Sequence, residues 1–214
     1  MYDVWQQRRQ DLRKALDKYL LIKEIYIECE ETDPELKSNL QPLNEFRAAL
    51  DHLFRIIDIN IANEQTPENE ERFRSQYSKL NGHLCRAFFD VCDHLVINYR
   101  NKISAFLGVY SPDAIQKAFP NYYSTIRPSI EKISLNIARY RVEKGTRDDN
   151  ELFDEYKRDV DTMREHYLII TDASTSPSLN AIRQYEKKQS LTNIGLAILG
   201  IIIGICGLLF GLLK

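Results

Sequence analysis

Apolar side chains recur with a helical period of about 3.6 residues along almost the whole of residues 1–173. No stretch alternates polar and apolar residues cleanly enough for a half-buried strand. Glycine is scarce in the same region, because five of the eight glycines fall in the last twenty residues. The sequence therefore predicts an all-α fold, with a multi-helix bundle over residues 1–173.

Proline, glycine and capping residues divide this region into separate helices. Thr66-Pro67 and Ser111-Pro112 each place a hydroxyl that can cap a helix before a proline that suits the first turn. Gly145 supplies a stop signal. We expect helices over residues 3–31, 42–63, 67–107, 112–119 and 148–171, with a further helix that ends near residue 144.

The C-terminal segment has a different composition. Between Leu191 and Leu213 none of the 23 residues is charged. As a helix, this segment would be about 34 Å long, enough to cross a hydrocarbon core of about 30 Å. We therefore expect one C-terminal transmembrane helix over residues 191–213, preceded by a hinge and juxtamembrane helix over residues 174–190.

The flanks of this segment predict its orientation. The N-terminus has no apolar run of the kind found in secretory signals, and Lys187 and Lys188 precede the expected span. We expect a single-pass protein of the inner (cytoplasmic) membrane, with residues 1–173 as a cytoplasmic helical bundle.

Small residues mark one side of the expected span. They recur at alternating intervals of three and four residues and include Ala197, Gly200, Gly204, Gly207 and Gly211. In lipid, helices associate mainly where small side chains let their backbones approach closely. We expect this edge to drive membrane oligomerisation. The predicted partners are therefore the lipid bilayer and further copies of the same chain.

Composition narrows the possible chemistry. The formal net charge is −2 and no long basic block occurs, which does not favour a partner held mainly through nucleic-acid phosphates. Cys29, Cys85, Cys92 and Cys206 form no CxxC pair, and we expect them to stay reduced. No glycine-rich phosphate loop, HExxH or paired-cysteine metal signature is present. We expect no cofactor and no metal site.

The segment 42–63 is apolar on two sides, which indicates a central or interfacial helix. One apolar side consists of Leu43, Phe46, Leu50, Phe54, Ile57 and Ile61. A charged stripe of alternating sign, with i, i+4 spacing, consists of Arg47, Asp51, Arg55 and Asp58. His52 lies about 140° around the helix from Arg47. The simplest interpretation is a salt-bridged stripe with a packed histidine.

A second group of polar residues falls on the segment 67–107. His83, Arg86, Asp90 and His94 share one side of this expected helix. We take as a candidate polar network His83, Arg86 and Asp90 together with Asp51 and Arg55. The simplest interpretation is a solvated polar face.

The sequence Arg47-Ala-Ala-Leu-Asp-His52 is an Arg-x4-His arrangement, which resembles the catalytic motif of the HEPN superfamily. The sequence segments that begin at Glu45 and at His83 also look like helical domains of membrane-tethered prokaryotic defence effectors. The resemblance covers about fifty residues. It implies a small helical bundle in which His52 is an acid–base catalyst and Arg47 steadies phosphate charge across a dimer seam.

These observations support three hypotheses. In the first, the protein is a membrane-anchored effector, active in antiviral defence, that self-associates through its glycine-seamed span and permeabilises the inner membrane. In the second, it is a membrane-tethered HEPN-type ribonuclease that acts as a dimer, and RNA is a partner only in this case. In the third, it is a passive tail-anchored scaffold. Enzymatic activity is expected only under the second hypothesis, and a signalling or defence protein is a further expected partner.

Overall fold

The computed structural model describes residues 2–33, 40–62, 66–172, 184, 187–198 and 200–201. Within these residues every regular element is helical, which confirms the predicted helical bundle. The elements are α1 (Tyr2–Thr32), α2 (Leu40–Ala62), α3 (Pro67–Leu107), α4 (Pro112–Ala118), the π-helical turn η1 (Tyr122–Ile126), α5 (Arg127–Glu143) and α6 (Asp149–Asp172).

The local signals in the sequence set several of these helix ends. The Thr66 hydroxyl accepts a hydrogen bond from the backbone N–H of Asn69 (3.2 Å), and the Ser111 hydroxyl accepts one from Ala114 (3.1 Å). Each thereby satisfies a backbone donor that the first helical turn would leave unpaired. Gly145 has φ 81°, a conformation that favours glycine, in the turn between α5 and α6.

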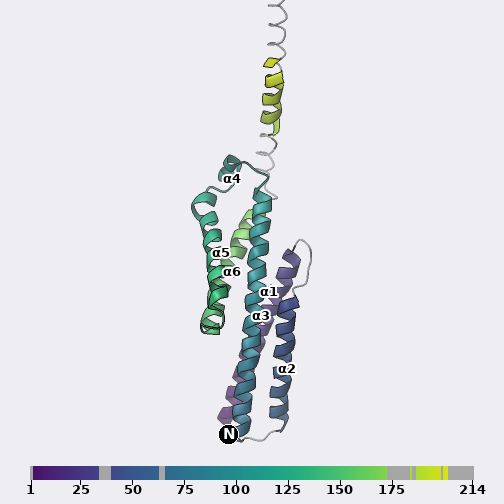
Figure 1. Ribbon diagram of the computed structural model, residues 1–214, viewed down its shortest axis with the longest axis vertical. Coiled ribbons are helices and arrows are strands. Elements are labelled where there is room, and N and C mark those ends of the chain that lie inside the picture. The colour runs from purple at the N-terminus through teal and green to yellow at the C-terminus, as the bar shows by residue number, and fades with distance from the viewer. Residues whose placement is uncertain are drawn as a thin grey trace, which may run out of the picture.

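The long helix α3 lies at the centre of the bundle (Figure 1). α1 runs in the same direction as α3, because Arg8 contacts Glu70 and Asn98 contacts Cys29 farther along both helices. α2 packs along the first part of α3, and α6 packs along a later part. α5 then packs on α6. Different helices therefore cover the first and the later part of α3.

Aromatic side chains fill the contact between α3 and α6. The rings of Phe88 and Phe153 stack with centroids 3.8 Å apart, and those of Phe89 and Tyr156 stack at 5.1 Å. Large buried rings contribute both apolar area and a preferred geometry. This contact therefore forms the main apolar core of the upper half of the bundle.

A buried carboxylate links the same helices. Asp93 accepts a hydrogen bond from the Tyr156 hydroxyl (2.9 Å) and lies 3.0 Å from both Lys144 Nζ and Arg141 Nε. Burial, followed by the charge of Asp93, raises the pKa of Tyr156 well above its usual range. Tyr156 therefore stays protonated and remains a hydrogen-bond donor. A charge inside the core is tolerated because it is paired in this way.

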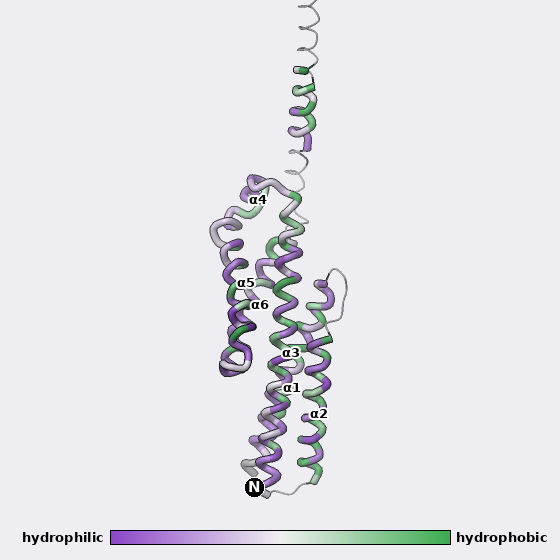
Figure 2. Tube along the Cα trace, in the orientation of Figure 1, coloured by the Kyte–Doolittle hydropathy of each residue, from purple (hydrophilic) through white to green (hydrophobic). Residues whose placement is uncertain are grey.

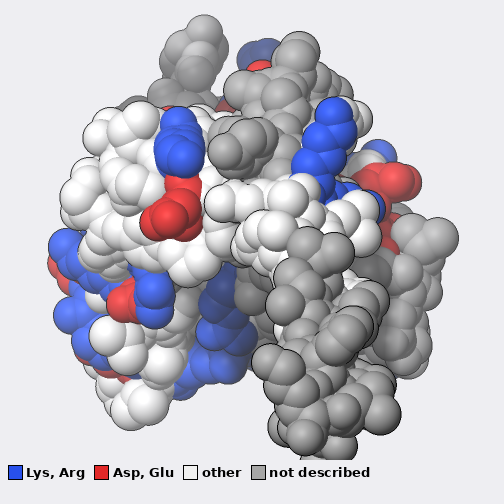
Figure 3. Space-filling view, turned by 90° about the horizontal axis from the view of Figure 1, so that it is seen from above, with Lys and Arg blue, Asp and Glu red and all other residues white. Residues whose placement is uncertain are grey.

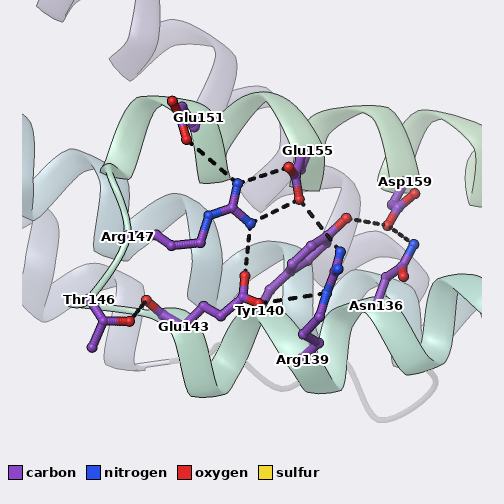
Figure 4. A network of polar contacts seen from close by, with 9 residues as sticks. All are labelled: Asn136, Arg139, Tyr140, Glu143, Thr146, Arg147, Glu151, Glu155 and Asp159. Carbon is purple, nitrogen blue, oxygen red and sulfur yellow. Dashed lines mark hydrogen bonds and ion pairs between the residues drawn. The ribbon is translucent and has the colours of Figure 1, made fainter.

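Ion pairs and hydrogen bonds join α5 to α6 (Figure 4). Arg147 lies 2.8 Å from Glu143 and 2.9 Å from Glu155. The hydrogen bond from Arg147 is the main favourable interaction that lowers the pKa of Glu155. One turn farther along, the Tyr140 hydroxyl donates to Asp159. These contacts fix the register of the helical hairpin around Gly145.

The expected C-terminal transmembrane helix is not supported, and that part of the predicted fold is wrong. Within the described residues, none of the helices combines the length and apolar character that a membrane crossing requires. The helical stretch over residues 187–198 includes two lysines and would be about 18 Å long, against a hydrocarbon core of about 30 Å. Residues 199 and 202–213 of the expected span lie outside the described residues, as does most of the expected hinge over 174–190.

We predict that Tyr156→Phe lowers the free energy of unfolding by about 1–2 kcal/mol, because the buried Asp93 loses one hydrogen-bond donor while the ring is kept. Urea unfolding followed by circular dichroism measures this loss. Tyr167→Phe is the matched control, since Tyr167 stacks on Tyr99 through its ring. Equal losses in both variants would contradict the assigned role of the Tyr156 hydroxyl.

His166 generates a prediction about pH. Its Nε2 lies 2.8 Å from the Ser129 hydroxyl, while its buried Nδ1 has no hydrogen-bond partner among the described residues. Burial lowers the pKa of His166 below its ordinary value of about 6.5. The unfolded chain therefore takes up this proton more readily, and stability falls as pH drops through that value.

We expect the urea midpoint to fall less between about pH 7.5 and pH 5.5 in His166→Gln than in the unchanged protein. His94→Gln, which changes an exposed histidine of α3, should leave the pH dependence as it is. If His166→Gln shows the same fall as the unchanged protein, His166 does not contribute to this pH dependence.

Candidate functional site

α2 presents two different sides, and the candidate functional residues divide between them. Its inner side packs on α3 through buried Ala49, Ile56 and Ile59. Its outer side carries large apolar residues that no other described helix covers. Polar residues that could do chemistry gather mostly at the inner side.

The centre of the inner group is a pair of stacked histidines. The rings of His52 on α2 and His83 on α3 lie with centroids 5.3 Å apart and planes 23° from parallel. His52 Nδ1 is 2.7 Å from the Gln76 side-chain oxygen, and His83 Nδ1 is 2.7 Å from Glu45 Oε2. We call His52, His83, Glu45, Gln76 and Arg86 the histidine cluster.

Arg86 completes the cluster and limits its protonation states. Its Nε donates to Glu45 Oε2 (3.0 Å), and its Nη2 lies 2.7 Å from His83 Nδ1. His83 Nδ1 either donates to Glu45 or accepts from Arg86, because a ring nitrogen cannot do both at once. The Glu45–Arg86 ion pair holds in either case, so it is the constant contact between α2 and α3 here.

The cluster brings together some of the predicted site residues and separates others. His52, His83 and Arg86 converge, as described above. Asp51 and Arg55 instead form an exposed ion pair with each other (2.8 Å, both 59% exposed). Asp90 lies 3.4 Å from Lys144, and burial raises its pKa despite that lysine.

Arg47 also lies apart from His52. It is exposed on the outer side of α2, and within the described residues no hydrogen bond or ion pair joins it to His52. Of the predicted oligomerisation residues, Ala197 and Gly200 fall in described helical positions, whereas Gly204, Gly207 and Gly211 lie outside the described residues.

Two members of the cluster were not expected from the sequence. Glu45 pairs with a residue 38 positions later, and Gln76 with one 24 positions earlier. No local spacing signals such long-range contacts. In chemical terms, the two imidazoles contact each other through their ring faces, and the arginine beside them is already paired with Glu45. Across the described stretches, no group of three or more potential ligands is arranged to hold a metal ion.

The outer side of α2 has a regular pattern of its own. Large apolar residues recur at the alternating intervals of three and four that are typical of paired helices. Their exposed fractions run from 40% to 76%. We define the α2 seam as these residues together with Arg47, which fills the one polar position in the series: Leu40, Leu43, Arg47, Leu50, Phe54, Ile57 and Ile61.

Single exposed apolar residues are common on protein surfaces, but a contiguous apolar stripe is not. Leu40 to Ile61 covers about 32 Å of helix, and Figure 2 shows hydrophobic residues recurring along the whole of α2. By contrast, the end of the bundle nearer α4 shows Lys and Arg interspersed with Asp and Glu (Figure 3). The α2 seam therefore has the character of an interface.

Comparisons with protein-family models, with curated proteins and with solved structures find no match for this chain. Function is therefore inferred from the geometry of the two sides of α2.

We predict that Glu45→Gln lowers the free energy of unfolding by about 1 kcal/mol, because a partly buried charged acceptor shared by His83 and Arg86 becomes neutral. Asp51→Asn is the matched control on the same helix. It alters only an exposed ion pair and should cost less than about 0.5 kcal/mol. Urea unfolding measures both, and a control that loses as much as Glu45→Gln would argue against an anchoring role for the cluster.

Proposed function

We propose that this protein is a self-associating helical scaffold, in which two copies pair through the α2 seam. The observation that carries the proposal is the exposure of six large apolar residues on one side of α2, which together with Arg47 recur at alternating intervals of three and four. Such spacing lets side chains of one helix fit between those of another.

The energetic reason is the removal of this surface from water. Complete burial of a Leu, Ile or Phe side chain contributes about 1.5–3 kcal/mol, and the α2 residues are already partly covered, so each retains a fraction of that value. Burial of six such residues on each copy would oppose the entropy lost on association. A scaffold needs no catalytic group, and the histidine cluster then serves to hold α2 on α3.

The membrane-permeabilising effector expected from the sequence depended on a transmembrane helix, and we do not carry it forward. The HEPN-type ribonuclease and a role in antiviral defence stay predictions. The ribonuclease is less favoured because Arg47 belongs to the α2 seam, whereas His52 contacts Gln76 on the other side of the helix. A scaffold explains Arg47 without requiring it to reach His52.

We predict that the full chain forms dimers and that Leu50→Glu combined with Phe54→Glu converts them to monomers. Two charges in the middle of the α2 seam would lose their hydration on pairing, which is costly. Sedimentation equilibrium in a mild non-ionic detergent measures the mass, with detergent used because residues 191–213 are uncharged.

The matched control is Leu135→Glu combined with Val142→Glu. These residues of α5 are 72% and 81% exposed but lie outside the α2 seam, so the control should remain dimeric. A monomeric unchanged protein would refute the proposal. A dimer that survives the α2 changes and is lost in Gly200→Leu combined with Gly204→Leu would locate self-association at the C-terminal glycines instead.

A further inference from the structure

We infer that the two α2 helices of the dimer run antiparallel, with Leu50 of one copy opposite Phe54 of the partner subunit. This inference rests on the proposed pairing through the α2 seam and specifies its orientation and register. It is carried by the positions of Arg47 and Asp58 on α2, because the apolar positions alone do not determine the orientation of the pair.

The charged stripe reads positive, negative, positive, negative from Arg47 through Asp51 and Arg55 to Asp58. Reversing this order exchanges the signs. In an antiparallel pair, Arg47 therefore comes opposite Asp58 of the partner subunit, whereas Asp51 lies at the same axial offset from Arg55 of the partner subunit as from Asp51 of the partner subunit. In a parallel pair in register, Arg47, which lies in the seam itself, would meet its own copy in the middle of the apolar contact.

The apolar residues fit the same antiparallel register. With Leu50 opposite Phe54 of the partner subunit, Leu43 comes opposite Ile61 of the partner subunit. Arg47 then comes opposite Ile57 of the partner subunit, one position before the Asp58 that it would pair with. The pairing of Arg47 with Asp58 and the apolar pairing thus agree to within one residue, which is less than one helical turn.

Arg47 and Asp58 are free to make these contacts. Both are exposed, and within the described residues neither has a hydrogen-bond or ion-pair partner. Asp51 and Arg55 pair with each other on the surface, so the charge of Asp51 is balanced within its own chain. A single polar residue in an otherwise apolar seam commonly selects helix orientation at some expense of stability.

The orientation can be read from cysteine cross-linking of the full chain. Leu43→Cys and Ile61→Cys are made separately in a Cys206→Ser background, and a short bismaleimide is added to each variant and to their mixture. In the inferred dimer, the two copies of residue 43 lie about 27 Å apart, as do the two copies of residue 61. Cross-linking should therefore appear only in the mixture. Random exchange of subunits makes half of the dimers heterodimeric, and this sets the upper limit of cross-linked product.

The background protein without an added cysteine controls for Cys29, Cys85 and Cys92, which are buried, and sedimentation confirms the mass of each variant. Cross-linking of either variant with itself would show a parallel pair, which overturns this inference but leaves self-association through the α2 seam intact. A dimer that cross-links in no sample would overturn the inferred register. A monomer in every sample, including the unchanged protein, would refute the proposed function itself.

Discussion

Packing against α3 is the constraint on which the rest of the structure depends. α1, α2 and α6 each make their principal helix contacts with α3, while α5 reaches it mainly through α6. α2 packs on α3 and also contacts α1, where Phe46 meets Tyr19 and Tyr26. No described helix packs on the opposite side of α2. Its inner side is covered and its outer side remains open. The exposure of the α2 seam is thus a consequence of how the core is built.

The histidine cluster converts this one-sided packing into a defined orientation. A helix held only by aliphatic contacts, such as those of Ala49 and Ile56, can rotate slightly without large cost. The Glu45–Arg86 ion pair and the His52–Gln76 contact have directional requirements that such a rotation would violate. Polar contacts on the inner side therefore aim the apolar residues of the outer side away from the core. The two sides of α2 act together in this sense.

Most of the helices could be predicted from the sequence because their limits are local. Thr66 and Ser111 cap the very turns that follow them, and Gly145 adopts the conformation that its turn requires. The cluster could not be predicted, since Glu45 and His83 meet only after α2 docks on α3. The sequence also showed that α2 is apolar on two sides but not which side is covered. The expected membrane crossing relied on composition over residues 191–213, and no helix of the described residues meets that requirement.

Arg47 is the residue at which the competing functions differ most. In the ribonuclease hypothesis, Arg47 must approach His52 of the partner subunit. The paired α2 helices would then have to place both residues on the same side of the interface. In the antiparallel register, however, His52 of the partner subunit lies on the side of its helix that faces its own α3, stacked on His83 and bound to Gln76. Arg47 then reaches Asp58 of the partner subunit, and no imidazole is near it. Catalysis that requires Arg47 to contact His52 of the partner subunit is thus incompatible with the inferred pairing of α2. An experiment that determines the orientation of the two α2 helices therefore also tests the ribonuclease hypothesis.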